Sequence, residues 1–340
     1  MERKAIALLS GGLDSTLAVK LLIDQEIEIT AVNFTSPFCN CTSRKAGCVH
    51  QARRVAEEFG IPIRVISKGM DYFRLVRNPR HGYGRGLNPC IDCRIYMLRK
   101  VREMMPELGS FVVTGEVLGQ RPMSQHRRAI ELIERESGLP GLILRPLSAH
   151  LFPPTLPEQD GVVDRAKLLA LSGRSRKPQI ELASRYGVRD YPCPAGGCLL
   201  TDETIAGRLQ DVFLHQEEFG AADIHLLKIG RHFRLNRHAK IVVGRDRREN
   251  EQIRAFFAAG SVFLRPSGFR GPVGLLLGEA DPETEQRAGE LLAGFSGEDR
   301  KSYCFFREEY GNPPERFCVD QRLAAEERTA MQIVLQRRLK

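Results

Sequence analysis

The first residues that could do chemistry form a short loop near the start of the chain. Residues 4–9 are an apolar run, and the helical pattern of residues 15–23 follows almost at once. Between them a glycine pair lets the backbone approach a phosphate, while hydroxyl groups and the helix N-terminus supply donors and partial positive charge. The loop residues are Ser10, Gly11, Gly12, Leu13, Asp14, Ser15 and Thr16. This composition predicts a site for a phosphate-bearing ligand.

Asp14 sets this loop apart from Walker-type phosphate loops. The Gly-Lys-Ser/Thr ending that holds a terminal phosphoryl group is missing, so transfer of that group is not indicated. A carboxylate has the wrong charge to bind bare phosphate, and we expect Asp14 to act through Mg²⁺ or to orient the loop. A tight strand–helix turn without any ligand is the alternative interpretation.

A second set of reactive residues is made of cysteines. Cys90 and Cys93 precede a basic amphipathic helix predicted over residues 94–105. A thiol at a helix N-terminus among arginines is expected to have a lowered pKa, as a sulfur nucleophile or a metal ligand requires. Cys198 lies in a Gly/Pro-rich segment and is the expected third member, with Cys193 as its alternative.

Three kinds of site could use Cys90, Cys93 and Cys198. A four-iron four-sulfur cluster would have three cysteine ligands and one open iron that carries sulfur. A structural zinc ion is the second reading. The third is a metal-free pair that forms a persulfide and then a disulfide. The residues alone leave all three open.

The other cysteines carry weaker signals. One group has a spacing that suits a zinc knuckle, although an ordinary buried cysteine fits each position equally well. Its members are Cys39, Cys41, Cys48 and His50. We predict that the isolated Cys304 and Cys318 are core residues. Paired disulfides are not expected in a chain with no signal-peptide pattern.

The elements that must position these residues alternate between strand and helix. Strands are predicted at residues 28–34, 61–66 and 111–114, and helices at residues 43–60, 164–172 and 177–186. Such alternation implies an α/β fold with a parallel sheet covered on both faces. Ligands then bind at the carboxyl ends of the strands, where Ser10 and Gly115 fall.

The pattern changes in the second part of the chain. Short strands are predicted at residues 224–229, 239–243 and 262–264, with a terminal helix at residues 321–340. This is an α+β texture rather than a continued parallel sheet. We therefore predict two domains, residues 1–200 and residues 201–340.

Positive charge is concentrated in the predicted first domain. Residues 1–200 hold 29 Lys and Arg against 20 Asp and Glu, whereas residues 201–340 hold 22 of each. A polyanionic partner such as a nucleic acid explains this surplus, and a solvated surface is the alternative. The candidate RNA contacts are Arg94 and Arg99 in the first domain and Arg231, Arg234 and Lys240 in the second.

The loop at residues 10–16 resembles that of the PP-loop pyrophosphatases, which split ATP between its α and β phosphates. Residues 114–120 and 143–147 resemble segments of tRNA 4-thiouridine synthetases, and residues 88–93 resemble the cysteine segment of tRNA 2-thiouridylases. Residues 224–250 resemble the RNA-associated NFACT-R module. The resemblance implies ATP bound by the loop, with Phe34, Gly115 and Gln120 beside the nucleotide.

These resemblances together imply an ATP-dependent tRNA sulfurtransferase, with 4-thiouridine at tRNA position 8 as the expected product. A 2-thiouridine synthase is the first alternative. A 7-cyano-7-deazaguanine synthase-like ligase is another, although those enzymes carry cysteines near the C-terminus and residues 319–340 have none. A non-catalytic RNA-binding protein with a relict loop is disfavoured because all the loop residues are present.

The sulfur donor and the setting are less constrained. No rhodanese region follows the predicted first domain and no THUMP region precedes its loop, so the donor is either a cysteine desulfurase persulfide or free sulfide. The longest apolar runs are too short to cross a bilayer, and a cytoplasmic location is expected. A homodimer is left open.

Overall fold

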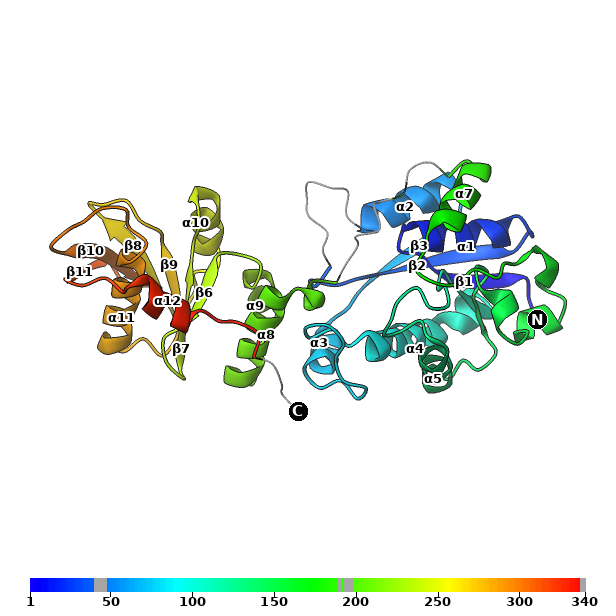
Figure 1. Cartoon of the computed structure of the whole chain (residues 1–340), viewed down its shortest axis with the longest axis horizontal. Helices are drawn as coiled ribbons and strands as arrows, with labels where there is room; N and C mark the ends of the chain where they lie inside the picture. The colour runs from blue at the N-terminus through cyan, green and yellow to red at the C-terminus, as the bar shows by residue number, and fades with distance from the viewer. Residues whose placement is uncertain (40–47, 189–190, 192–197, 337–340) are drawn as a thin grey trace. The chain divides into compact units, whose positions relative to one another are not determined.

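The computed structural model describes residues 1–39, 48–188, 191 and 198–336. It divides into two compact units, Met1–Thr201 and Asp202–Lys340 (Figure 1). In the part of the chain so described, no helix has the length and apolar character needed to cross a membrane.

Unit 1 is built on a five-stranded parallel sheet with the order β3-β2-β1-β4-β5. Its strands are β1 (Lys4–Leu8), β2 (Glu28–Thr35), β3 (Ile63–Ser67), β4 (Phe111–Thr114) and β5 (Ile143–Leu144). Its helices are α1 (Leu13–Ile23), α2 (Cys48–Glu58), α3 (Met70–Arg77), α4 (Cys90–Leu108), α5 (Arg127–Ser137), α6 (Leu156–Gln159) and α7 (Lys177–Arg185). The predicted α/β fold is confirmed.

Helices cover both faces of this sheet (Figure 1). Along β1, Ala5 and Ala7 face the core shared with α1 and α2, while Ile6 faces the core shared with α4 and α5. This alternation is the period of two that a strand buried on both sides requires. The strand order reverses between β1 and β4, which marks the crevice where ligands of such sheets bind.

Unit 2 is an antiparallel sheet of six strands with the order β11-β10-β8-β9-β7-β6. Its strands are β6 (Arg231–Arg234), β7 (Ala239–Val243), β8 (Ser261–Ser267), β9 (Gly274–Gly278), β10 (Tyr303–Glu309) and β11 (Glu315–Val319). Its helices are α8 (Glu203–His215), α9 (Ala221–Leu226), α10 (Arg247–Arg254), α11 (Pro282–Ala293) and α12 (Ala325–Met331). One core lies between the sheet and α11. The predicted α+β class is confirmed.

Three predicted elements are wrong. The expected strand at residues 224–229 is helix α9 as far as Leu226 and turn beyond it, because the Asp223 carboxylate accepts the Gly220 N–H at 2.8 Å and caps that helix. The expected helix at residues 164–172 is one short 3₁₀ turn, since the N–H groups of Leu169 and Leu171 bond residues 146 and 147 instead. The terminal helix ends at Met331.

The helix predicted at residues 43–60 is α2, which begins at Cys48 and ends at Glu58. The first residues of that prediction lie outside the described part of the chain. The helix predicted after the Cys-x-x-Cys segment is α4, and it includes Cys90 and Cys93 in its first turn.

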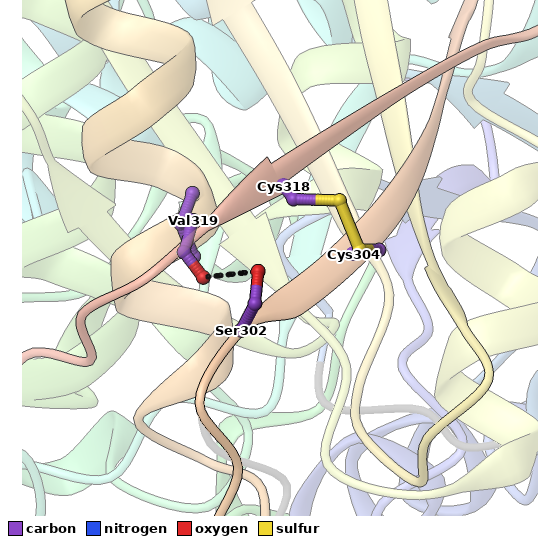
Figure 2. Close-up of a disulfide and its surroundings, with 4 residues drawn as sticks. All are labelled: Ser302, Cys304, Cys318 and Val319. Atoms are coloured by element: carbon purple, nitrogen blue, oxygen red, sulfur yellow. Dashed lines mark hydrogen bonds between the residues drawn. A yellow bond between two sulfur atoms is a disulfide. The ribbon is translucent and has the colours of Figure 1, made fainter.

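Cys304 and Cys318 are joined by a disulfide, so the prediction that they are isolated core residues is wrong. They stand directly opposite each other in the antiparallel pair β10–β11 (Figure 2). Cys304 is half-buried and Cys318 is exposed. Next to the disulfide, the Ser302 hydroxyl donates to the Val319 carbonyl at 3.4 Å. Cross-strand pairing brought together two residues 14 positions apart, which separate inspection of each cysteine does not reveal.

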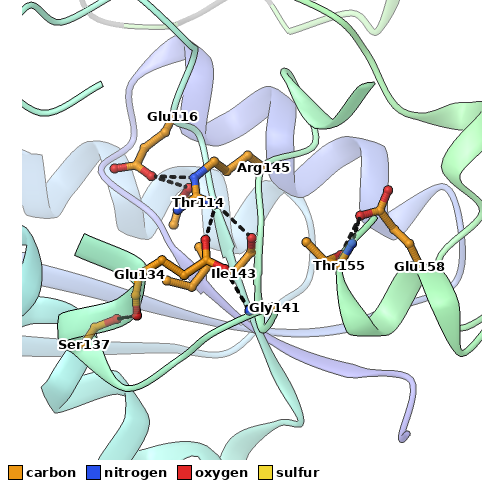
Figure 3. Close-up of polar contacts among 9 residues, drawn as sticks. All are labelled: Thr114, Glu116, Glu134, Ser137, Gly141, Ile143, Arg145, Thr155 and Glu158. Carbon is orange, nitrogen blue, oxygen red and sulfur yellow. Dashed lines mark hydrogen bonds and ion pairs between the residues drawn. The ribbon is translucent and has the colours of Figure 1, made fainter. Parts of the chain in front are cut away.

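A buried ion network fixes the ends of β4 and β5 (Figure 3). Arg145 donates from Nε to Glu116 Oε2 at 3.1 Å and from Nη1 to Glu134 Oε2 at 2.9 Å. The Thr114 hydroxyl donates to the same Glu116 oxygen at 3.3 Å, and Arg94 of α4 lies 3.4 Å from Glu116 Oε1. Burial opposes ionisation, yet Arg94 and Arg145 outweigh it and hold the pKa of Glu116 below its usual value.

Arg145→Met is expected to destabilise unit 1 by about 3–5 kcal/mol, because it leaves a buried carboxylate without its closest partner. Urea unfolding of the full chain measures this loss. Arg64→Met is the control: Arg64 is exposed and pairs with the exposed Glu107, so its removal should cost far less. Equal losses in the two variants would contradict a structural role for the network.

Wild type and Arg145→Met also give a test by pH. Because the folded pKa of Glu116 is lowered, its pairing stabilises the fold above about pH 4.3, the ordinary glutamate value, and is lost as the pH falls through the folded pKa. The stability gap between wild type and Arg145→Met should therefore narrow in acid. A gap that stays constant down to pH 3 would assign the cost to packing instead.

Candidate active site

The nucleotide loop is shaped by its own hydroxyl groups. Ser15 Oγ donates to the Gly12 carbonyl at 2.9 Å, and Thr16 Oγ1 donates to the same oxygen at 3.1 Å. Ser10 Oγ lies 3.0 Å from Ser15 Oγ and accepts the Gly12 N–H at 3.3 Å. The side chains of Ser15 and Thr16 are buried. These hydroxyls therefore hold the turn in place and leave its backbone to face a ligand.

Two glycines allow close contacts between backbones at this loop. Gly11 has φ +73°, and a Cβ there would lie 2.6 Å from Ala52 N of α2. A Cβ on Gly115 would lie 2.5 Å from Ser15 N. Since real Cβ atoms do not approach so closely, only glycine brings the end of β4 against the start of α1. Gly115 was predicted beside the nucleotide, and the structure places it in contact with the loop itself.

Asp14 has one occupied and one unused carboxylate oxygen. Oδ2 accepts the Gln120 amide at 2.8 Å and lies 3.5 Å from Arg176 Nη2. Oδ1 is buried and has no hydrogen-bond partner within the described chain. Gln179 in turn donates to Gln120 Oε1 at 3.2 Å. An orphaned carboxylate oxygen beside a phosphate loop fits a hard divalent cation such as Mg²⁺.

Phe34, which was predicted to lie beside the nucleotide, is near the carboxyl end of β2. It is partly buried and packs on the α4 side of the sheet, next to the β3 strand with which β2 pairs. Its partner across the strands is Ile66 of β3. The predicted role of Phe34 beside the nucleotide stays a prediction.

Cys93 contacts two side chains that inspection of the sequence missed. Lys68 Nζ lies 3.1 Å from Cys93 Sγ, and the Tyr72 hydroxyl lies 3.4 Å from the same sulfur. Lys68 is buried, and its ammonium also lies 4.4 Å from the centre of the Tyr72 ring. The available signal was the position of Lys68 directly after β3, at the ligand edge of the sheet.

The predicted lowering of the thiol pKa is wrong for Cys90. Burial raises the pKa of Cys90, with a further rise from Cys93, and nearby Arg94 does not offset this. Burial raises the pKa of Cys198 to about 12. Cys90, in the first turn of α4, is thus buried enough that its helix position and the neighbouring arginines do not lower its pKa.

Cys198 is held next to the end of β2. It forms an isolated antiparallel bridge with Cys39, and the next N–H, that of Leu199, bonds the Phe38 carbonyl at 2.8 Å. Burial and then the charges of Cys93, Cys198 and Cys39 raise the pKa of Tyr72, which places these thiols around one phenol. Even so, no three Cys, His, Asp or Glu side chains within the described ranges could share a metal ion.

The other residues of the predicted cysteine sites lie on the surface or outside the described part of the chain. Cys41, Cys193 and the side chain of Cys48 lie outside the described residues. His50 is exposed on α2. The zinc-knuckle interpretation and the alternative ligand Cys193 are therefore not addressed by the structure.

Arg121 connects the phosphate loop and the thiols electrostatically. Burial and then the charges of Arg94 and Arg176 lower its pKa, while Cys90 and Asp14 oppose that change. Arg121 is thus within electrostatic range of both the loop carboxylate and a thiol.

The candidate RNA contacts are largely engaged within the chain. Arg94 pairs with Glu116, and Arg99 donates from Nε and Nη2 to the Glu136 carbonyl at 3.0 and 2.8 Å. Arg231 stacks over the Phe295 ring at 4.9 Å. These contacts restrain the side chains, and each guanidinium would have to exchange or share a partner to reach a phosphate.

Lys240, one of the candidate RNA contacts, does not lie on an exposed strand face. It is 4 % exposed, because β7 is an interior strand between β6 and β9 and all five of its residues are buried. Arg234, on the neighbouring strand β6, donates from Nε to Asp211 at 2.9 Å. Residues 231–240 therefore do not form one exposed track.

Comparison with known proteins identifies both units. Residues 1–150 match the family model described as thiamine biosynthesis protein (ThiI), and residues 230–330 match the model described as NFACT protein RNA binding domain. The tRNA-specific 2-thiouridylase MnmA of Geobacter metallireducens is 32 % identical over 127 residues, which cover 32 % of this chain and 34 % of the relative. That of Clostridium acetobutylicum is 33 % identical over 111 residues, covering 28 % and 30 %.

The chain thus spans about a third of the length of the curated relatives it matches. A solved complex of a 4-thiouridine synthetase with RNA and bound ATP is 22 % identical, covers 54 % of this chain and 51 % of its own, and has a TM-score of 0.35, too low to argue from. Unit 1 is therefore similar to the ThiI family model and to part of the tRNA-specific 2-thiouridylases, and unit 2 is similar to the NFACT protein RNA binding domain.

Proposed function

We propose that this chain is an ATP-dependent tRNA sulfurtransferase. It adenylates a uridine carbonyl oxygen and replaces that oxygen with sulfur, forming 4-thiouridine at tRNA position 8. The observation that supports this most directly is the placement of a phosphate loop and a group of thiols at the carboxyl edge of one parallel sheet. Activation of an oxygen and delivery of sulfur need these two functions side by side.

Each strand delivers one part of the site. β1 leads into Ser10 and the phosphate loop, and β4 leads into Gly115, which packs on that loop. β3 leads into Lys68, which contacts Cys93. Because β3 lies two strands from β1 in the sheet, the thiols lie to one side of the nucleotide rather than on top of it. A base placed between them meets both.

The first step is adenylation. The uracil carbonyl oxygen attacks the α-phosphorus of ATP, the bond to the pyrophosphate oxygen breaks, and pyrophosphate leaves. The backbone of the loop and the N-terminus of α1 face the departing negative charge. Mg²⁺, held by the unused Oδ1 of Asp14, would supply further positive charge there. The former carbonyl oxygen is now part of an AMP leaving group.

The second step is sulfur transfer by Cys93 and Cys198. The sulfur arrives on one of these thiols as a persulfide, from a cysteine desulfurase persulfide or from a disulfide of the pair and free sulfide. Its terminal sulfur attacks the activated carbon and AMP leaves. The other thiol then cuts the S–S bond, which frees the thiouridine and leaves a Cys93–Cys198 disulfide. With a desulfurase donor, an external thiol reduces that disulfide for the next cycle; with free sulfide, the disulfide itself takes up the next sulfide.

The four-iron cluster stays a prediction, and the mechanism above does not require it. The described side chains offer no group of three ligands to one metal, and Cys93 contacts the ammonium of Lys68 instead. An ammonium at 3.1 Å suits a thiolate that acts as a nucleophile. The iron content of anaerobically purified protein tests the cluster directly.

One finding favours 2-thiouridine as a second candidate product. The curated relatives that match this chain are tRNA-specific 2-thiouridylases. The two products differ only in which uracil carbonyl meets the α-phosphate. Mass spectrometry of digested tRNA, with authentic 2-thiouridine and 4-thiouridine as standards, decides between them.

Asp14→Asn is expected to abolish pyrophosphate release, because it removes the charge of the loop carboxylate. Cys93→Ser should instead keep tRNA-dependent pyrophosphate release while losing sulfur incorporation, since it leaves adenylation intact. Pyrophosphate release and thionucleoside content are measured on the same reactions. The double variant Cys304→Ser, Cys318→Ser is the control and should retain both activities.

Full sulfur incorporation by Cys93→Ser would contradict its role in transfer. Full pyrophosphate release by Asp14→Asn would contradict the loop assignment. Release stimulated by a free deazapurine and not by tRNA would replace the proposed function with a small-molecule ligase.

Lys68→Met is expected to slow alkylation of Cys93 by iodoacetamide about tenfold at neutral pH. A hydrogen bond to a charged group is worth about 1.5–3 kcal/mol, and removal of the ammonium leaves the thiolate without it. Peptide mass spectrometry measures the rate at Cys93 separately from Cys90. Lys68→Arg should restore most of the rate, and Lys100→Met, which changes a partly exposed lysine of α4, should leave it unchanged. Equal rates in wild type and Lys68→Met would remove Lys68 from the mechanism.

A further inference from the structure

Unit 2 contains a small cavity with cationic walls. Its volume is about 90 Å³, and it lies among the end of α8, the strands β6 and β7 with their connecting turn, and the end of β9. The lining residues are His215, Gln216, Arg234, His238, Lys240, Leu277 and Gly278. No carboxylate is among the lining side chains, so the titratable groups that line the cavity are all basic.

Gly278 lets the walls close together. It has φ +96°, and a Cβ there would lie 2.0 Å from the carbonyl oxygen of His238. The end of β9 therefore packs directly on the turn that carries His238. The register pairs Ala239 with Gly278 and Lys240 with Leu277, which sets the ammonium-bearing strand beside this contact.

The charges around the cavity do not balance. Arg234 donates to both oxygens of Asp211 and so neutralises that carboxylate. Lys240 Nζ lies 3.9 Å from the same carboxylate and makes no side-chain hydrogen bond within the described chain. Two cations thus share one anion, and Lys240 is 4 % exposed. A buried charge without a full counter-charge is unfavourable. A bound anion would offset that cost.

The other carboxylates near Lys240 have partners of their own and do not line the cavity. Asp223, the next carboxylate that acts on Lys240, accepts the Gly220 N–H at 2.8 Å as a helix cap. Glu279 is exposed and lies 3.9 Å from His238 Nδ1. His215 Nδ1 is engaged with the Asp211 carbonyl at 2.8 Å. Consistent with this surplus, burial lowers the pKa of Lys240 in spite of Asp211.

We propose that this cavity binds a phosphate group, with Lys240 at its base and Arg234, His215 and His238 around it. The phosphate belongs either to RNA or to free phosphate, and the same oxyanion chemistry serves both. This site is separate from the phosphate loop of unit 1 and does not depend on the thiolation reaction. Arg234 and Lys240, which were predicted as RNA contacts, line this pocket.

A purely structural ion triad makes the opposite prediction for stability. If Lys240 is a counter-ion that Asp211 needs, Lys240→Met will destabilise the chain. If Lys240 is a surplus cation kept for a ligand, Lys240→Met leaves the Arg234–Asp211 pair balanced and removes a buried charge. In that case the variant unfolds at the same temperature as wild type or higher in phosphate-free buffer.

The test is thermal unfolding of the full chain in inorganic phosphate against chloride at equal ionic strength. A ligand that binds the folded state raises the midpoint, so wild type should show a saturable rise. Lys240→Met should lose the part of that rise that comes from unit 2, whereas any contribution of the unit 1 loop is common to both proteins. Arg247→Met, which removes an exposed cation of α10, is the matched control and should behave as wild type.

A second variant shows whether a lost response to phosphate comes from the site or from a folding defect. His238 is half-exposed, with a side chain 50 % accessible, so His238→Gln changes the rim without disturbing the core. It should weaken the phosphate-dependent rise and keep the unfolding midpoint in chloride. An unchanged rise in both Lys240→Met and His238→Gln, or a loss of several degrees for Lys240→Met in chloride, would overturn the proposal.

Binding of tRNA as a function of salt identifies the source of the phosphate. If RNA supplies it, Lys240→Met reduces the salt slope by about one, and inorganic phosphate competes with tRNA in wild type but not in the variant. If the slope is unchanged while the phosphate-dependent rise is lost, the pocket binds free phosphate. Either result supports the site.

Discussion

The buried carboxylate of Glu116 is the constraint on which the arrangement of unit 1 depends. It receives Arg145 from the end of β5 and Arg94 from α4, one residue after Cys93. It also directly follows Gly115, whose missing side chain lets the phosphate loop pack on β4. One ion network therefore connects the helix that carries the thiols with the strand that supports the loop. Displacement of either element would leave charge buried without a partner.

Burial is the effect that decides most of the local chemistry. At Cys90 and Cys198 it overcomes the cations and raises the thiol pKa values, whereas at Glu116 the two arginines overcome it. The difference lies in direct contact: Glu116 is ion-paired, while the arginines near Cys90 act from a distance. Cys93 is the thiol with an ammonium in direct contact, which is why it is assigned the nucleophilic step.

The sequence predicts features whose cause is local and misses those created by distant contacts. The strand, glycine pair and helix around Ser10 are adjacent in the chain, so the loop could be read from its residues. Lys68 is 25 residues from Cys93, and only the packing of α4 beside β3 brings them together. Likewise Lys240 was predicted as an RNA contact because basic residues recur through residues 228–254. Its burial follows from β7 being an interior strand, which single-strand patterns do not encode.

The Cys304–Cys318 bond has a consequence for how unit 2 meets other chains. β11 is an outermost strand, with one row of backbone N–H and C=O groups unpaired by its own sheet. Such an edge is a template for pairing with a second molecule, above all when the strand frays and exposes its neighbour. The crosslink ties β11 to β10 and closes a loop of about 15 residues, worth about 3 kcal/mol by chain entropy. The tendency of this protein to aggregate should therefore follow the redox state of its surroundings.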